Sequence, residues 1–449
     1  MKSANVNKLN EFYIGFKINQ INKEFDLLRF GLDNIINIEV KQKSTLERVE
    51  KQLRQNRYYL SFIGKEVYSF TYLSEEDSFY QYDNSNQLIE TNINTIAAIL
   101  KEQDIKEIYD INRLFKPSNY LVSPFNATDQ FLKGEYFLTQ HQNNIKNDLI
   151  GLFKSNETCF ASIVGVPGTG KTLLTYDIAN DYIKKKYKVQ IIHCANLNKG
   201  HHFLNEYEDW NISPIKNIHL ALNDDFDLLI VDEAQRLKET QLKKIVESVK
   251  SLNVKCIFSY DPEQCLSNEE SSRNIGSIIE EKISYKTHKL TKKIRTNKEI
   301  ASFIKGLFNL NKINYNQNYP NIGIQYFASD DSVREYSLNL YNNDWKIINF
   351  TKSQFNELTY DEYQNPLFDN SHAVIGQEYD KVVIFIDEHF YYDEQQRLRA
   401  THVRGGAYAI DKMLYQNITR TRDKLTLIIV RNKPVLKAVQ SILKENNSY

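Results

Sequence analysis

Short runs of alternating hydrophobic and polar residues dominate the first part of the chain. In residues 36–41, INIEVK, isoleucine or valine at every second position alternates with polar or charged residues. This period of two predicts a half-buried strand. Similar runs at 11–18, 24–30 and 65–73 predict further strands, and helical patterns occupy 44–60 and the region near 95–102. The mixture predicts a small α/β domain.

The remainder of the chain alternates apolar strand patterns with amphipathic helix patterns. The strands are predicted at 159–164, 188–194, 226–232 and 254–259, with helices at 172–186 and 239–252. A second series follows after Leu290, at 345–350, 381–387, 415–423 and 424–430. Strands that alternate with helices of this length predict parallel sheets with crossover helices. We therefore expect two α/β lobes in succession.

Domain boundaries follow from these patterns. We expect an N-terminal domain over 1–112, a linker over 113–135, a first lobe over 136–278 and a second lobe over 279–449. The linker carries two prolines and several turn-forming residues, which suit a connection between domains. A chain of 449 residues agrees with this division, because its length predicts roughly two to three domains.

Composition narrows the class of protein. The hydrophobic share is 41% and the charged share 25%, as in soluble globular proteins. Neither a signal peptide nor an apolar run long enough for a membrane helix is present, so we expect a cytoplasmic protein without a membrane partner. The four cysteines lack paired spacing, which argues against a zinc site. Lys plus Arg and Asp plus Glu both number 57, so only local patches would hold a polyanion.

A phosphate-binding loop is predicted at residues 165–172, GVPGTGKT, between a strand and a helix. Backbone N–H groups of such a loop wrap phosphate at a helix N-terminus. The side chain of Lys171 would reach the β and γ phosphates of ATP, and the hydroxyl of Thr172 would bind Mg²⁺. The predicted nucleotide contacts are Gly165, Gly168, Thr169, Gly170, Lys171 and Thr172.

Two acidic residues end the apolar strand LLIVDE at 228–233. Carboxylates at the end of a buried strand are costly unless a cation pairs with them. Asp232 is therefore the expected partner of Mg²⁺, and Glu233 is the expected base that orients the attacking water.

The segment DEAQR at 232–236 resembles motif II of superfamily 1 helicases, and other segments resemble further motifs in that family's order. LTQHQ at 138–142 is similar to the Q motif, and SYDPEQ at 259–264 to motif III. KIRTN at 293–297 is similar to motif IV, GQEY at 376–379 to motif V and YQNITRTR at 415–422 to motif VI. The lead-in segments 117–126 and 131–142 resemble the Schlafen group 3-type helicase domain.

This resemblance implies two RecA-like lobes that bind ATP between them. It implies that Gln142 recognises the adenine, that Gln264 senses the γ-phosphate and that Glu378 in motif V contacts the nucleotide. Arg295 and Arg420 would contact the γ-phosphate from the second lobe, with Arg420 as the arginine finger. Ile294 stands where many relatives have an aromatic residue that stacks on adenine. The motif spacing leaves little room for large inserted subdomains, so ATP hydrolysis is a firmer expectation than strand separation.

The N-terminal domain resembles the PD-(D/E)XK nucleases, in which two acids on neighbouring strands hold Mg²⁺ and a lysine helps to activate water. The matching residues are Asp26, Glu39 and Lys41, and alternation directs the last two to one face of a strand. Gln55 and Tyr59, four apart on the following helix, resemble a RecB-type pair whose glutamine supports the active site. The resemblance implies a restriction-endonuclease-like α/β fold. One alternative to a nuclease site is that the E-x-K pattern lies on a surface strand without function. Another is that the domain is an inactive relic of the nuclease fold.

Together these features predict an ATP-dependent nuclease and helicase or translocase that acts on DNA, with ATP and Mg²⁺ as cofactors. Its Mg²⁺-dependent phosphodiester cleavage would be coupled to ATP hydrolysis, in bacterial defence against phage or in DNA repair. A partner encoded in the same operon or a homo-oligomer would fit such a machine. One alternative is an ATP-gated switch that binds nucleic acid or a partner without cutting. Another is a helicase directed to RNA. The arginines of 391–412 would contact nucleic acid or simply be solvated.

Overall fold

The computed structural model describes residues 10–18, 23–108, 110–115, 122–136, 138–155, 158–207, 209–291, 298–353, 358–401 and 408–443. Contacts divide the chain into two compact units. The N-terminal unit comprises 1–121 and 132–140, and the larger unit comprises 122–131 and 141–449. Among the helices of the described residues, none has the length and apolarity that crossing a bilayer requires.

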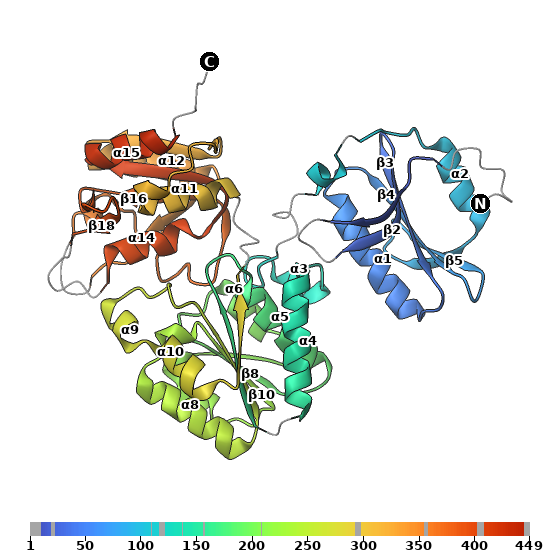
Figure 1. The fold of residues 1–449 in the computed structure, drawn as a ribbon, viewed down its shortest axis with the longest axis horizontal. Coiled ribbons are helices and arrows are strands. Elements are labelled where there is room, and N and C mark those ends of the chain that lie inside the picture. Colours follow the sequence, from blue (N-terminus) through green and yellow to red (C-terminus); the bar gives the residue numbers. More distant parts are fainter. Residues whose placement is uncertain are drawn as a thin grey trace. The chain divides into compact units, whose positions relative to one another are not determined.

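The N-terminal unit is built on one mixed sheet (Figure 1). Its described strands follow the order of the chain: β1 (Tyr13–Lys17), β2 (Glu24–Phe30), β3 (Asn34–Lys41), β4 (Glu66–Leu73), β5 (Ser78–Tyr82) and β6 (Leu88–Thr91). β3 and β4 are parallel and the other neighbouring pairs are antiparallel. The parallel pair requires a crossover, and helix α1 (Leu46–Ser61) makes it.

β3 is buried on both faces, whereas the alternation predicted a half-buried strand. Ile36 and Ile38 pack with the apolar face of helix α2 (Ile93–Glu102). The opposite face of β3 carries Ile35, which packs with α1 residues, and the polar residues that follow it at every second position. Because helices cover both faces, the polar positions of β3 lie inside the unit and require hydrogen-bond partners.

The first lobe of the larger unit has a parallel sheet with the order β12-β7-β11-β10-β8-β9. The strands are β7 (Cys159–Gly165), β8 (Val189–His193), β9 (Trp210–Pro214), β10 (Leu228–Asp232), β11 (Lys255–Tyr260) and β12 (Lys286–Leu290). The described helices of this lobe are α4 (Gln140–Ser155), α5 (Lys171–Lys184), α6 (Lys199–Asn205), α7 (Ile218–Ala221), α8 (Glu239–Leu252), α9 (Asn268–Arg273) and α10 (Ile275–Ile278). Ligands of such sheets bind at the carboxyl ends of the strands.

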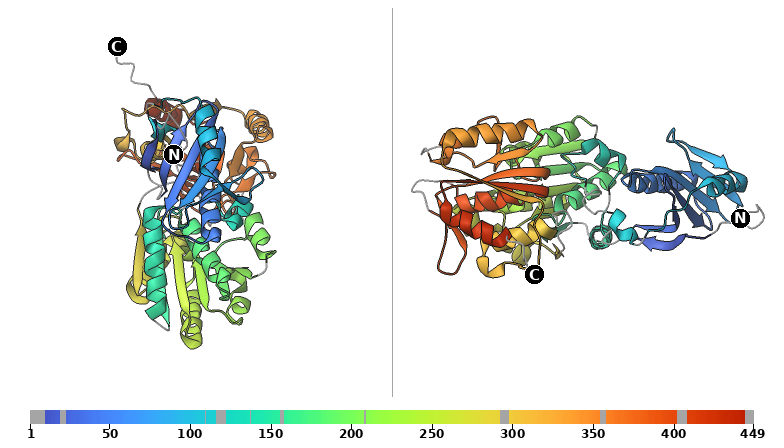
Figure 2. Two further views of the ribbon diagram at one scale, coloured as in Figure 1. Left: turned by 90° about the vertical axis from the view of Figure 1, so that its right-hand side faces the viewer. Right: turned by 90° about the horizontal axis from the view of Figure 1, so that it is seen from above.

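The second lobe has a parallel sheet with the order β13-β19-β16-β14-β15 and helices on both of its faces (Figure 2). The strands are β13 (Ile322–Phe327), β14 (Lys346–Asn349), β15 (Asp369–Asn370), β16 (Tyr379–Ile386) and β19 (Thr421–Val430). The described helices are α11 (Lys298–Phe308), α12 (Asp330–Asn342), α13 (Tyr360–Tyr363), α14 (Ile410–Ile418) and α15 (Lys433–Leu443). A small antiparallel hairpin, β17 (Phe390–Tyr392) with β18 (Leu398–Ala400), follows β16.

Residues 122–131, which we call the strap, lie within the expected linker but pack on the larger unit. Phe125 is buried, with its ring centroid 5.0 Å from that of Tyr176 and 3.9 Å from that of His201. Asn126 donates a hydrogen bond from Nδ2 to the carbonyl of Glu378 in the second lobe. The strap, which ends within α3 (Thr128–Lys133), therefore contacts both lobes.

Candidate functional site

The phosphate loop joins the end of β7 to the start of α5. Gly168 and Gly170 have φ angles of 76° and 81°, in the left-handed region that glycine adopts readily. A Cβ at Gly165 would lie 2.6 Å from Thr169 Oγ1, so only glycine fits the close turn. Gln142 packs behind the loop and donates from Nε2 to the carbonyls of Thr169 and Gly170, at 3.3 and 3.1 Å.

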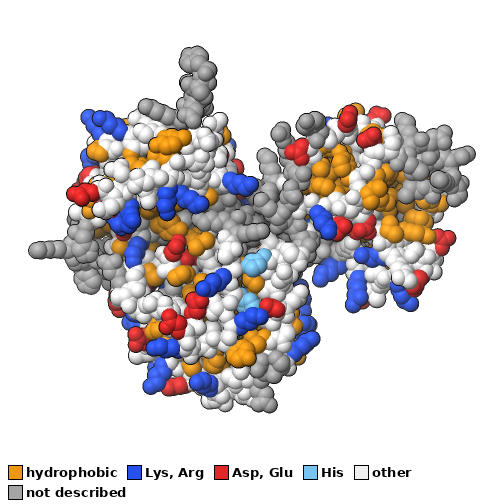
Figure 3. Space-filling view, in the orientation of Figure 1, with side chains coloured by type: hydrophobic (Ala, Val, Ile, Leu, Met, Phe, Trp, Pro, Cys, Tyr) orange, Lys and Arg blue, Asp and Glu red, His pale blue; other side chains and the backbone are white. Residues whose placement is uncertain are grey.

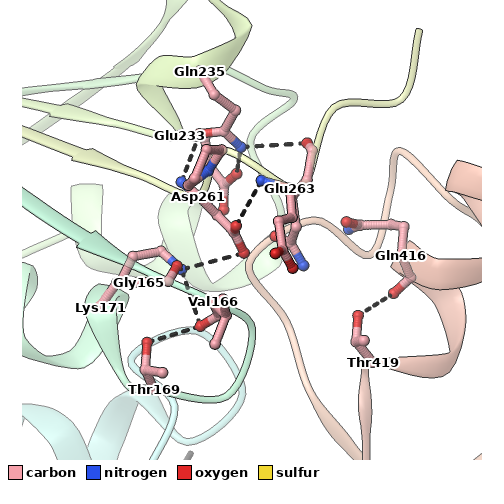
Figure 4. A network of polar contacts seen from close by, with 12 residues as sticks. Gly165, Val166, Thr169, Lys171, Glu233, Gln235, Asp261, Glu263, Gln416 and Thr419 are labelled. Carbon is pink, nitrogen blue, oxygen red and sulfur yellow. Dashed lines mark hydrogen bonds and ion pairs between the residues drawn. The ribbon is translucent and has the colours of Figure 1, made fainter. Parts of the chain in front are cut away.

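Lys171 lies at the first position of α5 and is buried. Its Nζ donates to the carbonyl of Gly165 and lies 3.7 Å from Asp261 Oδ2, at the end of the neighbouring strand β11 (Figure 4). Burial raises the pKa of Asp261, while the charge of Lys171 acts in the opposite direction. Lys171 thus lies at the carboxyl edge of the sheet as its proposed role requires.

Asp232, the last residue of β10, pairs with a histidine that the sequence analysis did not consider. Asp232 Oδ2 lies 3.2 Å from Nδ1 of His193, which ends the adjacent strand β8. Thr172, the second residue of α5, is half-buried. The donor chemistry of Asp232 and Thr172, a carboxylate and a hydroxyl, fits Mg²⁺, which prefers oxygen ligands.

Glu233 has a left-handed backbone with φ 57° and ψ 37°, unusual for a residue other than glycine. Its Oε2 accepts a hydrogen bond from Gln235 Nε2 at 2.6 Å and lies 3.8 Å from Arg236 Nε. Burial acts to raise the pKa of Glu233, but Arg236 and Lys171 oppose it and the pKa is lowered overall. The side chain therefore stays ionised near neutral pH and could accept a proton.

Gln235 links motif II to motif III, a role that the sequence did not reveal. In addition to its bond to Glu233, Gln235 Nε2 donates to the carbonyl of Gln264 at 3.5 Å. Gln235 Oε1 accepts from the N–H of Asp261 at 3.2 Å. Gln264 is buried, and its Nε2 has no hydrogen-bond partner among the described residues. Its amide is therefore available to a ligand, as a γ-phosphate sensor would need.

Arg420 reaches the same region from the second lobe. It is buried and donates from Nε to the carbonyl of Gln416 at 3.1 Å and from Nη1 to the carbonyl of Gln377 at 3.2 Å. Burial lowers the pKa of Arg420, and the charges of Glu378, Glu233 and Asp261 oppose this effect. Acidic groups from both lobes are thus close enough for their charges to act on the guanidinium. Arg295 lies outside the described residues.

In the N-terminal unit, Asp26 and Glu39 lie on adjacent antiparallel strands. Leu27 pairs with Ile38, so the residues beside them, Asp26 and Glu39, are neighbours across β2 and β3. Asp26 Oδ2 accepts a hydrogen bond of 2.8 Å from the N–H of Val40, next to Glu39. The hairpin therefore brings two carboxylates together from separate stretches of sequence.

Glu39 is 1% exposed and held by a cluster of amides. Its Oε1 accepts from Asn37 and Asn56 at 3.1 and 2.8 Å, and its Oε2 accepts from Gln52 at 2.5 Å. Gln55, the glutamine predicted to support the active site, is half-buried on the same helix as Gln52. Burial raises the pKa of Glu39, while the charge of Lys23 and the hydrogen bonds from Asn37 and Asn56 act to lower it.

Two lysines lie near this pair of acids. Lys41 follows Glu39 on the same face of β3 and is half-buried. Lys23 was not anticipated; burial lowers its pKa, while Glu39 and Asp26 are close enough to oppose that effect. No group of three or more His, Cys, Asp or Glu side chains suited to a metal occurs in the described part of the chain. Two carboxylates from adjacent strands fit one Mg²⁺ in donor chemistry, with water and phosphate as its other ligands.

The segment between motifs V and VI forms the β17–β18 hairpin and lines a groove of about 270 Å³. Arginine, lysine and aromatic side chains line this groove beside two acids: Arg397, Arg399, Lys412, Phe308, Tyr415, Glu263 and Asp411. Figure 3 shows cationic and anionic side chains mixed over the visible face of the larger unit. This mixture agrees with the zero net charge and does not by itself define a nucleic-acid surface.

The parallel sheets, the phosphate loop and the acidic end of β10 define the larger unit as a P-loop NTPase. Residues 162–428 match the family of viral superfamily 1 RNA helicase core domains. The match covers more than half of the chain, so the chain belongs to this family of superfamily 1 helicases. The predictions of a superfamily 1 helicase and of an α/β class with parallel sheets are therefore confirmed.

Solved helicase structures resemble the chain at low identity. Pif1 helicase from Candida albicans is 12% identical, with 68% of this chain and 99% of that chain covered and a TM-score of 0.35. Unliganded Pif1 from Bacteroides sp is 11% identical, with 70% and 98% covered and a TM-score of 0.36. These likenesses concern the fold alone. No curated protein matches the chain.

Proposed function

We propose that the chain is an ATP-driven translocase on nucleic acid that carries a Mg²⁺-dependent nuclease in its N-terminal unit. The observation that carries the first half is that Lys171 and Arg420 both lie close enough to Glu233 for their charges to interact with it. They come from separate segments and both lobes, and Arg420 is close enough to Glu233 and Asp261 for their charges to act on it. Such a set of groups suits phosphoryl transfer, in which positioning and charge supply most of the catalysis.

In this mechanism Lys171 holds the phosphates from the first lobe and Arg420 holds the γ-phosphate from the second. Glu233, which stays ionised, orients the attacking water and accepts its proton. Mg²⁺, held by Asp232 and Thr172, would neutralise developing charge on the phosphates when bound. ATP would draw the lobes together and its hydrolysis would release them, so that nucleic acid bound across both lobes advances in each cycle.

The nuclease half of the proposal depends on Asp26 and Glu39. Their neighbouring strands, the amide cluster that fixes Glu39 and the nearby lysines support a site for one metal ion and one scissile phosphate. Mg²⁺ would supply a Lewis acid there. Lys41 would orient the water, and Gln52 and Asn56 would keep the carboxylate of Glu39 in position. The restriction-endonuclease-like class and the Schlafen group 3-type relationship belong to the same proposal.

DNA is the proposed substrate, in bacterial defence or repair in the cytoplasm, with an operon-encoded partner or a second copy as the proposed associate. RNA is the rival substrate, and the family that matches the core is described as RNA helicases. A second rival is an ATP-gated switch that binds without cutting. It is favoured by the deep burial of Glu39, which limits access to its carboxylate.

One experiment separates these proposals. Purified protein is incubated with linear duplex, circular duplex and single-stranded DNA and with RNA, each with and without Mg²⁺ and ATP, while cleavage and phosphate release are followed. We expect ATPase stimulation by DNA and Mg²⁺-dependent cleavage. Stimulation by RNA alone would support the RNA rival, and stimulation without cleavage would support the switch. ATPase activity that no nucleic acid stimulates would contradict the translocase.

A further inference from the structure

Gln416, one helical turn before Arg420, is a buried amide without a described partner. It is 1% exposed, and neither Nε2 nor Oε1 has a hydrogen bond to any part of the chain that the structure describes. Burial of an unpaired polar group is unfavourable, because the group gives up its hydrogen bonds to water without replacing them. An apolar residue would fill the position without this cost, so a bound ligand is the physical reason for an amide there.

Its position in α14 brings Gln416 to the junction of the lobes. The residue before it, Tyr415, donates from its hydroxyl to Glu263 Oε2 of the first lobe at 3.4 Å. The residue after Glu263 is Gln264, whose Nε2 is likewise buried without a described partner. Two side-chain amide nitrogens without a partner among the described residues, those of Gln264 and Gln416, therefore lie next in the chain to a contact that joins the lobes.

The main chain of Gln416 is anchored, so that its side chain has a defined direction. Its carbonyl accepts from Arg420 Nε at 3.1 Å and from Thr419 Oγ1 at 3.0 Å. In Figure 4 the side chain extends from the second lobe toward the segment of Asp261 and Glu263. It thus points toward the segment of the first lobe that carries Asp261, whose charge also acts on Arg420.

We propose that Gln416 is a further catalytic residue of ATP hydrolysis, whose amide donates a hydrogen bond to the γ-phosphoryl group. This rests on the proposed ATPase function. The phosphoryl oxygens are acceptors, and a neutral amide can stay buried in the nucleotide-free protein at lower cost than a third cation beside Arg420 and Lys171. Gln264 from one lobe and Gln416 from the other would then contact the same phosphate.

The test is the substitution Gln416→Leu, which keeps the volume and removes both polar atoms. We expect kcat for ATP to fall by about 10²-fold, the usual loss for one donor to a developing charge. We expect KM to stay within about twofold, because the contact acts in the transition state. The melting temperature should stay equal or rise, because an unpaired buried amide is removed. Gln440→Leu, at an exposed site on α15, is the matched control and should change none of these.

A kcat for Gln416→Leu within about twofold of wild type would overturn the proposal, whatever its melting temperature. If that variant does not fold, Gln416→Met serves, because it keeps the unbranched side chain and removes the donor without adding a charge. Absence of ATP turnover in the wild type would defeat the proposed function itself. Binding of ADP with aluminium fluoride then still tests Gln416: we expect at least about tenfold weaker binding by the leucine variant, and equal binding would overturn the proposal.

Discussion

At the scale of the residue, the proposed chemistry depends on Glu233 and its immediate partners. Its left-handed backbone, the hydrogen bond from Gln235 and the nearby Arg236 fix one orientation of the carboxylate. A backbone held in a sparsely populated conformation persists only where its surroundings impose it. The end of β10 therefore combines strain with charge at one residue, as expected of a group that acts on a substrate.

Glu233→Gln should permit nucleotide binding but lower kcat for ATP hydrolysis by about 10²- to 10⁴-fold, the range for loss of a general base. The shape is kept, and only the proton acceptor and the negative charge are lost. Fluorescent ATP binding and phosphate release measure the two effects. Glu247→Gln, on the exposed face of α8, serves as the control. Normal hydrolysis by Glu233→Gln would show that another group orients the water.

His372 predicts how stability responds to pH. Burial, with a smaller effect of Arg236, lowers the pKa of His372 to about 4. The unfolded chain, with an ordinary histidine pKa, therefore binds more protons than the folded chain between about pH 6.5 and pH 4. This group's contribution to stability is complete above that window and is lost as the pH falls through it. His372→Gln should reduce the fall in melting temperature between pH 7 and pH 5, and an unchanged pH profile would contradict the assignment.

At the scale of the element, helix α1 decides which side chain supports Glu39. Gln52 and Asn56 are four residues apart, and both donate to Glu39 in the sheet. Gln55 is adjacent to Asn56 in sequence, so its side chain is rotated by about 100° around the helix axis from that of Asn56. The helix phase thus selects Gln52 as the donor. Side chains at spacing i and i+4 share a face, which is why the pair acts together.

We expect Gln52→Leu to lower Mg²⁺-dependent cleavage by about tenfold or more, since partners of metal ligands typically matter to that degree. Gln55→Leu, on the same helix, is the matched comparison and should have a smaller effect. Cleavage of labelled linear DNA measures both. A larger loss from Gln55→Leu would favour Gln55 as the residue that supports the active site.

The strap depends on a glycine in α6. A Cβ at Gly200 would lie 2.3 Å from the Cα of Phe125, so an alanine there must displace the strap. We expect Gly200→Ala to destabilise the larger unit by about 1–3 kcal/mol, the usual cost of overpacking. Gly151→Ala in α4, where nothing lies within 4 Å, should be neutral or slightly stabilising. Melting temperatures of both variants check this, and equal values would mean that the strap yields without cost.

At the scale of the whole molecule, the two units carry separate sets of groups that we propose to be catalytic. The N-terminal unit has its own sheet, and the larger unit has a parallel sheet and a core in each lobe. The groups proposed for hydrolysis of ATP and of DNA lie in different units. We expect Glu39→Gln to abolish cleavage and leave kcat for ATP within about twofold of wild type. Lys171→Ala should abolish ATP turnover. Loss of ATPase activity in Glu39→Gln would show that the units depend on each other for folding or catalysis.

Local features of the sequence determined much of this protein. Short-range geometry depends on residues that are close in sequence. It therefore allowed the sequence to predict the phosphate loop, the acidic end of β10 and the periodicity of the strands. For the same reason the α/β class and the succession of two parallel sheets followed from the pattern, and the motif order led to the helicase family.

Only the tertiary structure decided which distant side chains meet. The pairing of His193 with Asp232, the choice of Gln52 over Gln55 and the burial of β3 on both faces depend on strand order, helix phase and the packing of α2. The contact of the strap with both lobes and the burial of the Gln416 amide without a described partner depend on the packing of residues far apart in the chain. The hydrophobic periodicity of the sequence does not specify such contacts, because they depend on how whole helices and strands pack against one another.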